Sequence, residues 1–167
     1  MWKFNFKELG SDNWLLPDET TRHFVGMKNA DEYVKDVLGA KLSESVPKDI
    51  QALFEIARGA TLYGYLFYPF FALAAGQLFG VAEAALVHKR DQLGMPKNKK
   101  RFVDRIEYLE QQGVFSHDKA DHWHTIRRLR NSETHVSSQS IIPPGHGIGL
   151  LYGLAEDINK LFENSEK

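Results

Sequence analysis

The chain has 167 residues, of which 43% are hydrophobic and 26% are charged, a composition ordinary for one globular domain. Its formal net charge of −1 excludes a globally basic nucleic-acid binder, so any nucleic-acid site must be a local patch whose binding depends on salt. The absence of cysteine excludes disulfides and thiolate metal sites and is compatible with a reducing cytoplasm.

Residues 1–45 are predicted to form a short extension that packs on the main helical domain. Trp2, Phe4 and Phe6 alternate with polar residues, which is typical of a short strand or of aromatic side chains that anchor a segment onto a folded body. Residues 30–38 have helical spacing, with acids in the first turn and a glycine after the end, and predict a short helix. A partner-binding arm is the alternative. No apolar run of the signal-peptide kind follows the first residues, and we expect a cytoplasmic location.

A helical domain is predicted over residues 46–167, beginning with a long helix near Pro47, because proline suits the first turn of a helix. Residues 59–82 carry no charged side chain and are numerous enough to be weighed as a membrane span. Pro69 and several glycines interrupt this stretch, and its apolar pattern continues as an amphipathic helix as far as Leu86. We therefore predict buried core helices with a boundary at Pro69, and no membrane partner.

Glu83 is an isolated carboxylate within this apolar pattern. One interpretation places it on the surface near the end of its helix. The other has it face Arg128 or Arg130 across the packing of two helices and hold the guanidinium in place, because a buried glutamate needs such a partner.

The segment from Gly94 to Arg101 is predicted to be a strongly basic loop, since it contains glycine, proline and asparagine among its lysines. Such runs are usually solvated, but this one can also hold a phosphate backbone beside the arginines that follow later in the chain. The candidate RNA-binding residues are Lys97, Lys99, Lys100, Arg101 and Arg127.

Residues 102–109 predict a short helix that is closed by a glycine, and Ser116 is the expected N-cap of the helix that follows. His117, His122 and His124 lie in the first turns of that next helix. Because His122 and His124 point about 160° apart on a helix, and no third ligand has suitable spacing, we predict surface histidines without a metal site or other cofactor.

Residues 127–135, with the sequence RRLRNSETH, continue this helix and contain the best candidates for chemistry. At about 100° per residue, Asn131 and His135 lie one turn apart on one face. His124 and Arg128 extend the same face into a polar stripe. Another face is predicted to be buried, and it carries Ile126, Leu129 and Val136.

Three of these residues suit the cleavage of a phosphodiester without a metal. Arg130 carries a permanent charge whose fork matches phosphate oxygens. His135 can take or give a proton near neutral pH, and Asn131 can hydrogen-bond its ring and fix its orientation. The alternative is that Arg128 and Arg130 are solvated helix charges and that His135 interacts only with the negative end of the helix dipole.

Residues 141–147 contain two prolines and two glycines and are predicted to be a loop that borders the site. His146 in this loop is a second candidate proton carrier. Residues 148–162 have helical apolar spacing and predict the closing helix. Together these elements predict an all-α fold, an antiparallel bundle of four to five helices with a short N-terminal extension.

The hexad from Arg130 to His135 resembles the Arg-polar-x-x-x-His signature of the HEPN superfamily. These small all-helical domains occur in toxin–antitoxin, abortive-infection, restriction-associated and CRISPR-associated ribonucleases. The similarity covers about residues 60–164. Within it, residues 78–86 resemble the long early helix with an inward glutamate, residues 102–109 resemble the short helix before the motif helix, and the last helical segment resembles the closing helix.

The resemblance implies a metal-independent endoribonuclease in a toxin or antiviral defence context. His135 would act as the general base on a ribose 2′-OH or assist proton transfer at the leaving 5′-oxygen, and Arg130 would stabilise the transition state. Asn131 would orient His135 or hold a phosphate oxygen. The supporting residues would be Glu83, Arg128 and His124.

Further expectations follow from the same resemblance. The products would carry 2′,3′-cyclic phosphate and 5′-hydroxyl ends, and DNA would be spared because it lacks the internal nucleophile. One histidine cannot easily serve as both acid and base, and HEPN nucleases dimerise so that two motifs face a shared cleft. We therefore expect RNA as substrate, a homodimer whose two-fold axis runs near His135, and in some settings an antitoxin or defence-system partner.

Two other classes of function remain open. Many HEPN-like domains have lost catalysis and serve as dimerisation or partner-docking modules, and the unremarkable net charge is compatible with that class. A regulatory domain that holds a nucleotide on the basic stripe is the other class, and it predicts ligand-dependent thermal stabilisation at low salt.

Overall fold

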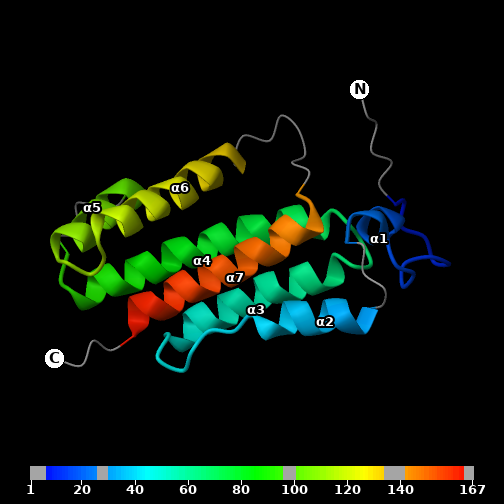
Figure 1. Ribbon diagram of the computed structural model, residues 1–167, viewed down its shortest axis with the longest axis horizontal. Coiled ribbons are helices and arrows are strands. Elements are labelled where there is room, and N and C mark those ends of the chain that lie inside the picture. Colours follow the sequence, from blue (N-terminus) through cyan, green and yellow to red (C-terminus); the bar gives the residue numbers. More distant parts are fainter. Residues whose placement is uncertain (1–6, 26–29, 96–100, 134–141, 164–167) are drawn as a thin grey trace.

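The computed structural model describes residues 7–25, 30–95, 101–133 and 142–163, and these ranges contain seven helices and no strand (Figure 1). The predicted all-α fold is therefore confirmed. Trp2, Phe4 and Phe6 lie outside the described residues. In chain order the helices are α1 (Glu19–Val25), α2 (Ala30–Gly39), α3 (Lys48–Tyr63), α4 (Phe70–Gln92), α5 (Phe102–Gln111), α6 (His117–Glu133) and α7 (Pro144–Phe162).

The helices form one bundle with α4 at its centre. α4 packs against α3 and α7 on one side, and α5 and α6 form a hairpin that lies over it on the other side (Figure 1). α2 lies along α3, and its Tyr33 and Val37 are fully buried in the common core. Because α4 is covered on several sides, it needs apolar residues around most of its circumference, which explains the uncharged stretch seen in the sequence.

Within the described ranges, α4 is the one helix long and apolar enough to cross a membrane. Half of the residues in its most apolar stretch are buried inside the bundle. The core helix of a bundle meets the same criteria of length and composition, and the packing of four other helices on α4 fits that interpretation.

Prolines mark the beginnings of the long helices. Pro47 directly precedes α3 and Pro69 directly precedes α4, as the sequence predicts. The prediction that residues 141–147 form a loop is wrong for their second half, because α7 begins at Pro144. Proline at the first position of a helix loses no hydrogen bond and already has a helical φ, so the pair Pro143–Pro144 starts a helix here.

Gly113 ends α5, as predicted, with a φ of 68°, in the left-handed region that favours glycine. Its N–H donates to the carbonyl of Glu110 at 2.9 Å, and the N–H of Val114 donates to that of Leu109 at 2.9 Å. This tight turn lets α6 begin at His117 and run back antiparallel to α5 (Figure 1). As a result, α6, which carries the first residues of the predicted hexad, packs on α4.

Asp18 fastens the N-terminal segment to the turn between α3 and α4. Its buried carboxylate accepts hydrogen bonds from the backbone N–H of Thr20 at 2.8 Å and of Tyr68 at 2.9 Å. Its own N–H donates to the carbonyl of Tyr65 at 2.9 Å, and the Thr21 hydroxyl donates to a neighbouring carbonyl of the same turn at 2.7 Å. One side chain thus caps α1 and satisfies a buried donor at the start of the central helix.

We expect Asp18→Ala to lower the free energy of unfolding by about 1–2 kcal/mol, because it leaves the buried N–H of Tyr68 without an acceptor. Urea unfolding followed by circular dichroism measures the change. The matched control is Asp12→Ala, since Asp12 is exposed in the same N-terminal segment and its loss should have little effect. Equal midpoints for the two variants would show that the Asp18 contacts contribute nothing.

Candidate nucleic-acid site

α6 positions the residues of the predicted motif. The helix begins directly after Ser116 and buries Ala120, Trp123 and Ile126 against the bundle. Leu129 was predicted to be buried with Ile126, and this prediction is wrong, since Leu129 is 46% exposed. The buried face is centred near Trp123. Ile126 lies about 60° from Trp123 around the helix, and Leu129 lies a further 60° in the same direction, so Leu129 turns to solvent.

One carboxylate links α4, α5 and α6 near the C-terminal end of α6. Glu83 of α4 accepts a hydrogen bond from Arg105 Nη1 of α5 at 2.6 Å and another from Arg130 Nη2 of α6 at 3.0 Å. We call these three residues the Glu83 cluster. The contact of Glu83 with Arg130 is one that the sequence predicts. Arg128, the alternative partner, is exposed and instead donates to the hydroxyl of Thr125 at 2.8 Å on its own helix.

The two guanidiniums of the Glu83 cluster differ in exposure. The side chain of Arg105 is 10% exposed, that of Glu83 is 27% exposed and that of Arg130 is 41% exposed. Two cations share one carboxylate, and Arg130, the more exposed of the two, presents its charge to solvent. A guanidinium that is held by a carboxylate and partly open to solvent is suited to receive a phosphate oxygen.

Arg105 is the member of the cluster that the sequence reasoning missed. It lies three residues after Phe102 and four before Leu109, and both of these are buried, so Arg105 falls on the apolar face of α5. A charged residue on the buried face of an amphipathic helix signals a partner elsewhere in the fold. The sequence places Arg105 on the apolar face of α5 and Glu83 within the apolar pattern of α4, so it contained the information needed to pair the two residues.

Asn131 is exposed, and its Oδ1 accepts a long hydrogen bond of 3.4 Å from Arg130 Nη1. The predicted catalytic histidine, His135, lies outside the described residues, as does Val136. The role of Asn131 in orienting the His135 ring therefore stays a prediction. Within the described part of the motif, Asn131 contacts Arg130, which belongs to the Glu83 cluster.

His124 and Arg127 lie on α6 within two turns of Arg130, and both are half-buried. In the part of the chain that the structure describes, the buried Nδ1 of His124 and the buried Nε of Arg127 have no hydrogen-bond partner. Buried polar atoms without partners are uncommon in folded proteins. Around the helix, Arg127 lies about 60° and His124 about 120° from Arg130, so the three side chains do not share one face of α6.

The predicted RNA-binding lysines of the basic loop, Lys97, Lys99 and Lys100, lie outside the described residues. Arg101, the last of that group, is exposed and forms an ion pair with Asp104 at 2.7 Å in the first turn of α5. Its partner neutralises it locally, so Arg101 adds less positive potential to the site than the sequence suggests.

The histidines at the start of α6 pair with carboxylates. His117 Nδ1 lies 2.8 Å from Glu110, and this hydrogen bond raises the pKa of His117. His122 Nε2 lies 2.6 Å from the buried carboxylate of Asp157 on α7. Among the described residues, no three metal-ligating side chains come together. His146 is exposed in the first turn of α7.

Comparisons of the chain with protein-family models, with curated proteins and with solved structures find no match.

Proposed function

We propose that the protein is a metal-independent endoribonuclease of the HEPN type that acts in the cytoplasm. The observation that carries the proposal is the Glu83 cluster, in which a carboxylate of the central helix holds a partly exposed arginine of the motif helix. The hexad resemblance and this arrangement support each other, because the arginine of the hexad is the residue that the carboxylate holds.

In the proposed reaction, Arg130 binds a non-bridging oxygen of the scissile phosphate. Arg105 neutralises Glu83, so the carboxylate anchors Arg130 without cancelling its attraction for phosphate. As negative charge develops on the phosphorane-like transition state, a guanidinium held in place stabilises it without reorganisation. Asn131, beside Arg130, holds a second phosphate oxygen or orients the ring of His135.

His135 handles the protons. It removes the proton of the ribose 2′-OH as that oxygen attacks phosphorus, and the bond from phosphorus to the 5′-oxygen breaks. The leaving oxygen takes a proton, so the products are a 2′,3′-cyclic phosphate and a 5′-hydroxyl. In a homodimer with two motifs across a shared cleft, one His135 serves as base and its copy in the second chain serves as acid.

The test is a cleavage assay on single-stranded RNA in EDTA, comparing the parent chain with His135→Ala at equal concentration. We expect the parent to cleave and to leave cyclic-phosphate ends, and the variant to be inactive, because it lacks the proposed acceptor of the 2′-OH proton. His146→Ala is the matched control, since His146 is exposed and the proposed reaction does not use it. Cleavage by His135→Ala at the parent's rate would refute the assignment.

A second candidate function is a non-catalytic docking module. The observation that favours it is the Glu83 cluster itself, because an arginine that ties two helices together has a structural reason to be present. In that case substitution of Arg130 or His135 changes assembly or partner binding, and RNA is cleaved by neither parent nor variant. Light scattering of parent and variants, run beside the cleavage assay, separates the two functions.

A further inference from the structure

An apolar face of the bundle is open to solvent along α3 and α4, which lie side by side (Figure 1). Leu73 of α4 is 62% exposed, and Ile56 and Tyr63 of α3 are 60% and 58% exposed. Gly76 and Gly80 are the other exposed residues of α4 before its last turn. We call these five residues the α3–α4 face. All of them except Ile56 fall within residues 59–82, a stretch without a charged side chain.

The residues of the α3–α4 face lie on one side of the helix pair. Gln77 Nε2 of α4 donates to the carbonyl of Leu53 of α3 at 3.2 Å, which marks the contact line between the two helices. Ile56 lies about 60° from Leu53 around α3, and Gly80 lies about 60° from Gln77 around α4. Both turn away from the core, since the buried residues of each helix lie on the other side of the contact line. The exposed side chains of the two helices therefore form one continuous surface.

Two exposed glycines inside a long helix need a reason. Glycine lowers helix stability relative to alanine, because its backbone loses more conformational freedom on folding. A Cβ added to Gly76 or Gly80 would meet no described atom within 4 Å, so packing within the described chain does not require glycine at either position. What the two glycines do is leave the backbone of α4 open, so that another chain can approach it closely.

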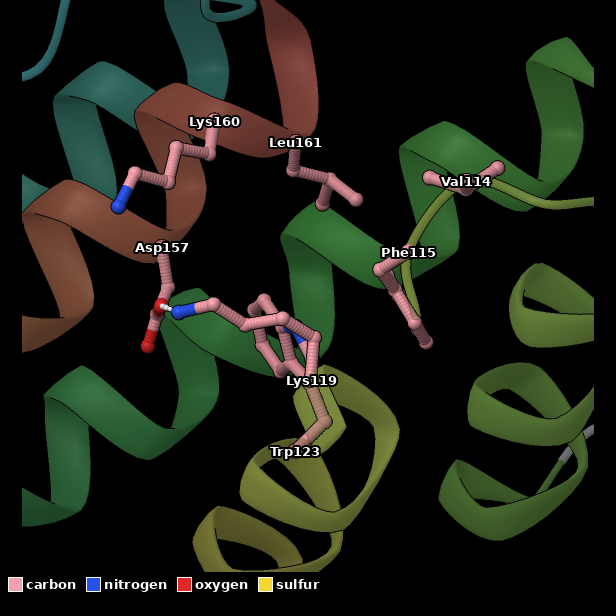
Figure 2. Close-up of a pocket in the computed structure, with 7 residues that line it drawn as sticks. All are labelled: Val114, Phe115, Lys119, Trp123, Asp157, Lys160 and Leu161. Atoms are coloured by element: carbon pink, nitrogen blue, oxygen red, sulfur yellow. Dashed lines mark hydrogen bonds and ion pairs between the residues drawn. The ribbon is translucent and has the colours of Figure 1, made fainter. Parts of the chain in front are cut away.

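Elsewhere the chain covers its apolar residues itself. In the cavity of about 190 Å³ between α6 and α7, Lys119 extends beside Trp123 and pairs with Asp157 at 3.1 Å (Figure 2). Trp123 is only 2% exposed as a result of its packing there. Among the described residues, nothing covers the α3–α4 face in this way. Its cover has to come from another molecule.

The α3–α4 face is complementary to itself. When two copies of α4 cross antiparallel about a two-fold axis between Gly76 and Gln77, residues at equal distances from the axis meet. Leu73 of one copy then lies opposite Gly80 of the other copy, so a large side chain enters the space left by a missing one. A two-fold axis also brings like charges together, and the uncharged stretch of this face avoids that repulsion.

The size of the face is compatible with a weak dimer. Ala52 and Ala84 continue it by one turn, so it spans twelve residues of each helix, about 18 Å, and two helix diameters, about 20 Å. The flat area is roughly 360 Å² per copy and about 700 Å² for two copies. Once the relief of the side chains is counted, this comes close to the total of about 1,000 Å² that a specific interface needs. The face is too short for the hydrocarbon core of a bilayer, which is about 30 Å thick.

We propose that the α3–α4 face binds a second copy of this chain, with the two α4 helices antiparallel and the two-fold axis near Gly76. The inference rests on the proposed function in one respect, because it names the surface through which the homodimer of that function forms. The exposed side chains and the glycines support the contact whatever the chain does. Its tests measure assembly in the absence of RNA, so a failure of this inference is distinguishable from a failure of the ribonuclease.

Sedimentation equilibrium of the full chain from about 10 to 500 µM tests for the dimer, and we expect reversible dimerisation with a Kd in the micromolar range. Leu73→Glu should weaken it at least tenfold by placing a carboxylate in an apolar contact, and Gly80→Leu should do the same by filling the open space. The matched controls are Leu38→Glu on α2 and Gly149→Leu on α7. They change exposed residues of the same types outside the face and should dimerise like the parent.

Disulfide cross-linking locates the axis. The chain contains no cysteine, so Gly76→Cys introduces a single thiol, which near a two-fold axis lies opposite its own copy. Oxidised glutathione should convert most of this variant to a covalent dimer at a concentration of about 500 µM, while the control Gly149→Cys should stay largely monomeric. A parent that is monomeric at that concentration, or a dimer that persists unchanged in Leu73→Glu and Gly80→Leu, would overturn the proposal.

Discussion

Arg130→Ala is expected to reduce the rate of RNA cleavage by about two to three orders of magnitude while leaving the fold intact. The substitution removes the exposed guanidinium that binds the scissile phosphate. It leaves Glu83 paired with Arg105 at 2.6 Å, so no buried charge loses its last partner. The loss in stability should therefore be only about 1 kcal/mol, since the side chain of Arg130 is 41% exposed. Single-turnover cleavage in EDTA and urea unfolding measure the two quantities separately.

Arg128→Ala is the control for this variant. Arg128 lies on the same helix two residues earlier, is exposed, and contacts Thr125 and not the Glu83 cluster. Its removal takes away the same formal charge from the same surface. We expect less than about a threefold change in rate at moderate salt, because a single exposed charge contributes only screened, non-specific attraction. If both variants lose activity equally, general electrostatics and not a positioned arginine controls cleavage.

Arg130→Lys refines the result. A lysine keeps the charge but lacks the planar fork, so it cannot contact Glu83 and a phosphate with separate nitrogens of one rigid group. An intermediate rate is expected. Full activity in Arg130→Ala would remove the arginine from the mechanism and leave the docking module as the better account of the Glu83 cluster.

The architecture of the bundle was accessible from sequence because it depends on local signals. Pro47 and Pro69 begin helices since proline fixes a helical φ and needs no hydrogen bond there. Gly113 ends α5 because the chain needs a positive φ at that turn. The same reasoning failed at Pro144, where the tendency of proline to interrupt a helix was weighed above its tendency to start one.

The candidate site was only partly accessible, because it depends on contacts between distant residues. Periodicity placed Leu129 in the core, but α6 buries Trp123 and Ile126 and leaves Leu129 exposed, while Arg130 of the same helix contacts Glu83. The orientation of α6 depends on its contacts with other helices, and the sequence of α6 alone does not contain this information. The partner of Glu83 on α6 was predicted from the need of a buried carboxylate for a cation. The second partner, Arg105, could be found only by comparing the apolar face of α5, which carries a cation, with the apolar pattern of α4, which carries a carboxylate.

Glu83→Ala is expected to lower the free energy of unfolding by about 2–4 kcal/mol. The substitution removes the 2.6 Å ion pair between Glu83 and Arg105, whose side chain is only 10% exposed, and also removes the carboxylate that lies between Arg105 and Arg130. The upper part of the range for broken buried pairs is not expected, because Glu83 and Arg130 are partly solvated. Urea unfolding at neutral pH measures the change, and Glu55→Ala, which breaks an exposed pair with Arg58 on α3, is the control.

Double-mutant cycles then apportion the effect between the two arginines. The coupling of Glu83 with Arg105 should exceed its coupling with Arg130, because the Arg105 contact is shorter, at 2.6 Å against 3.0 Å, and less exposed. That result would mean that Arg105 supplies the stability and leaves Arg130 available to a substrate. The reverse order would mean that Arg130 is mainly a structural tie between α4 and α6, and it would favour the docking module over the ribonuclease.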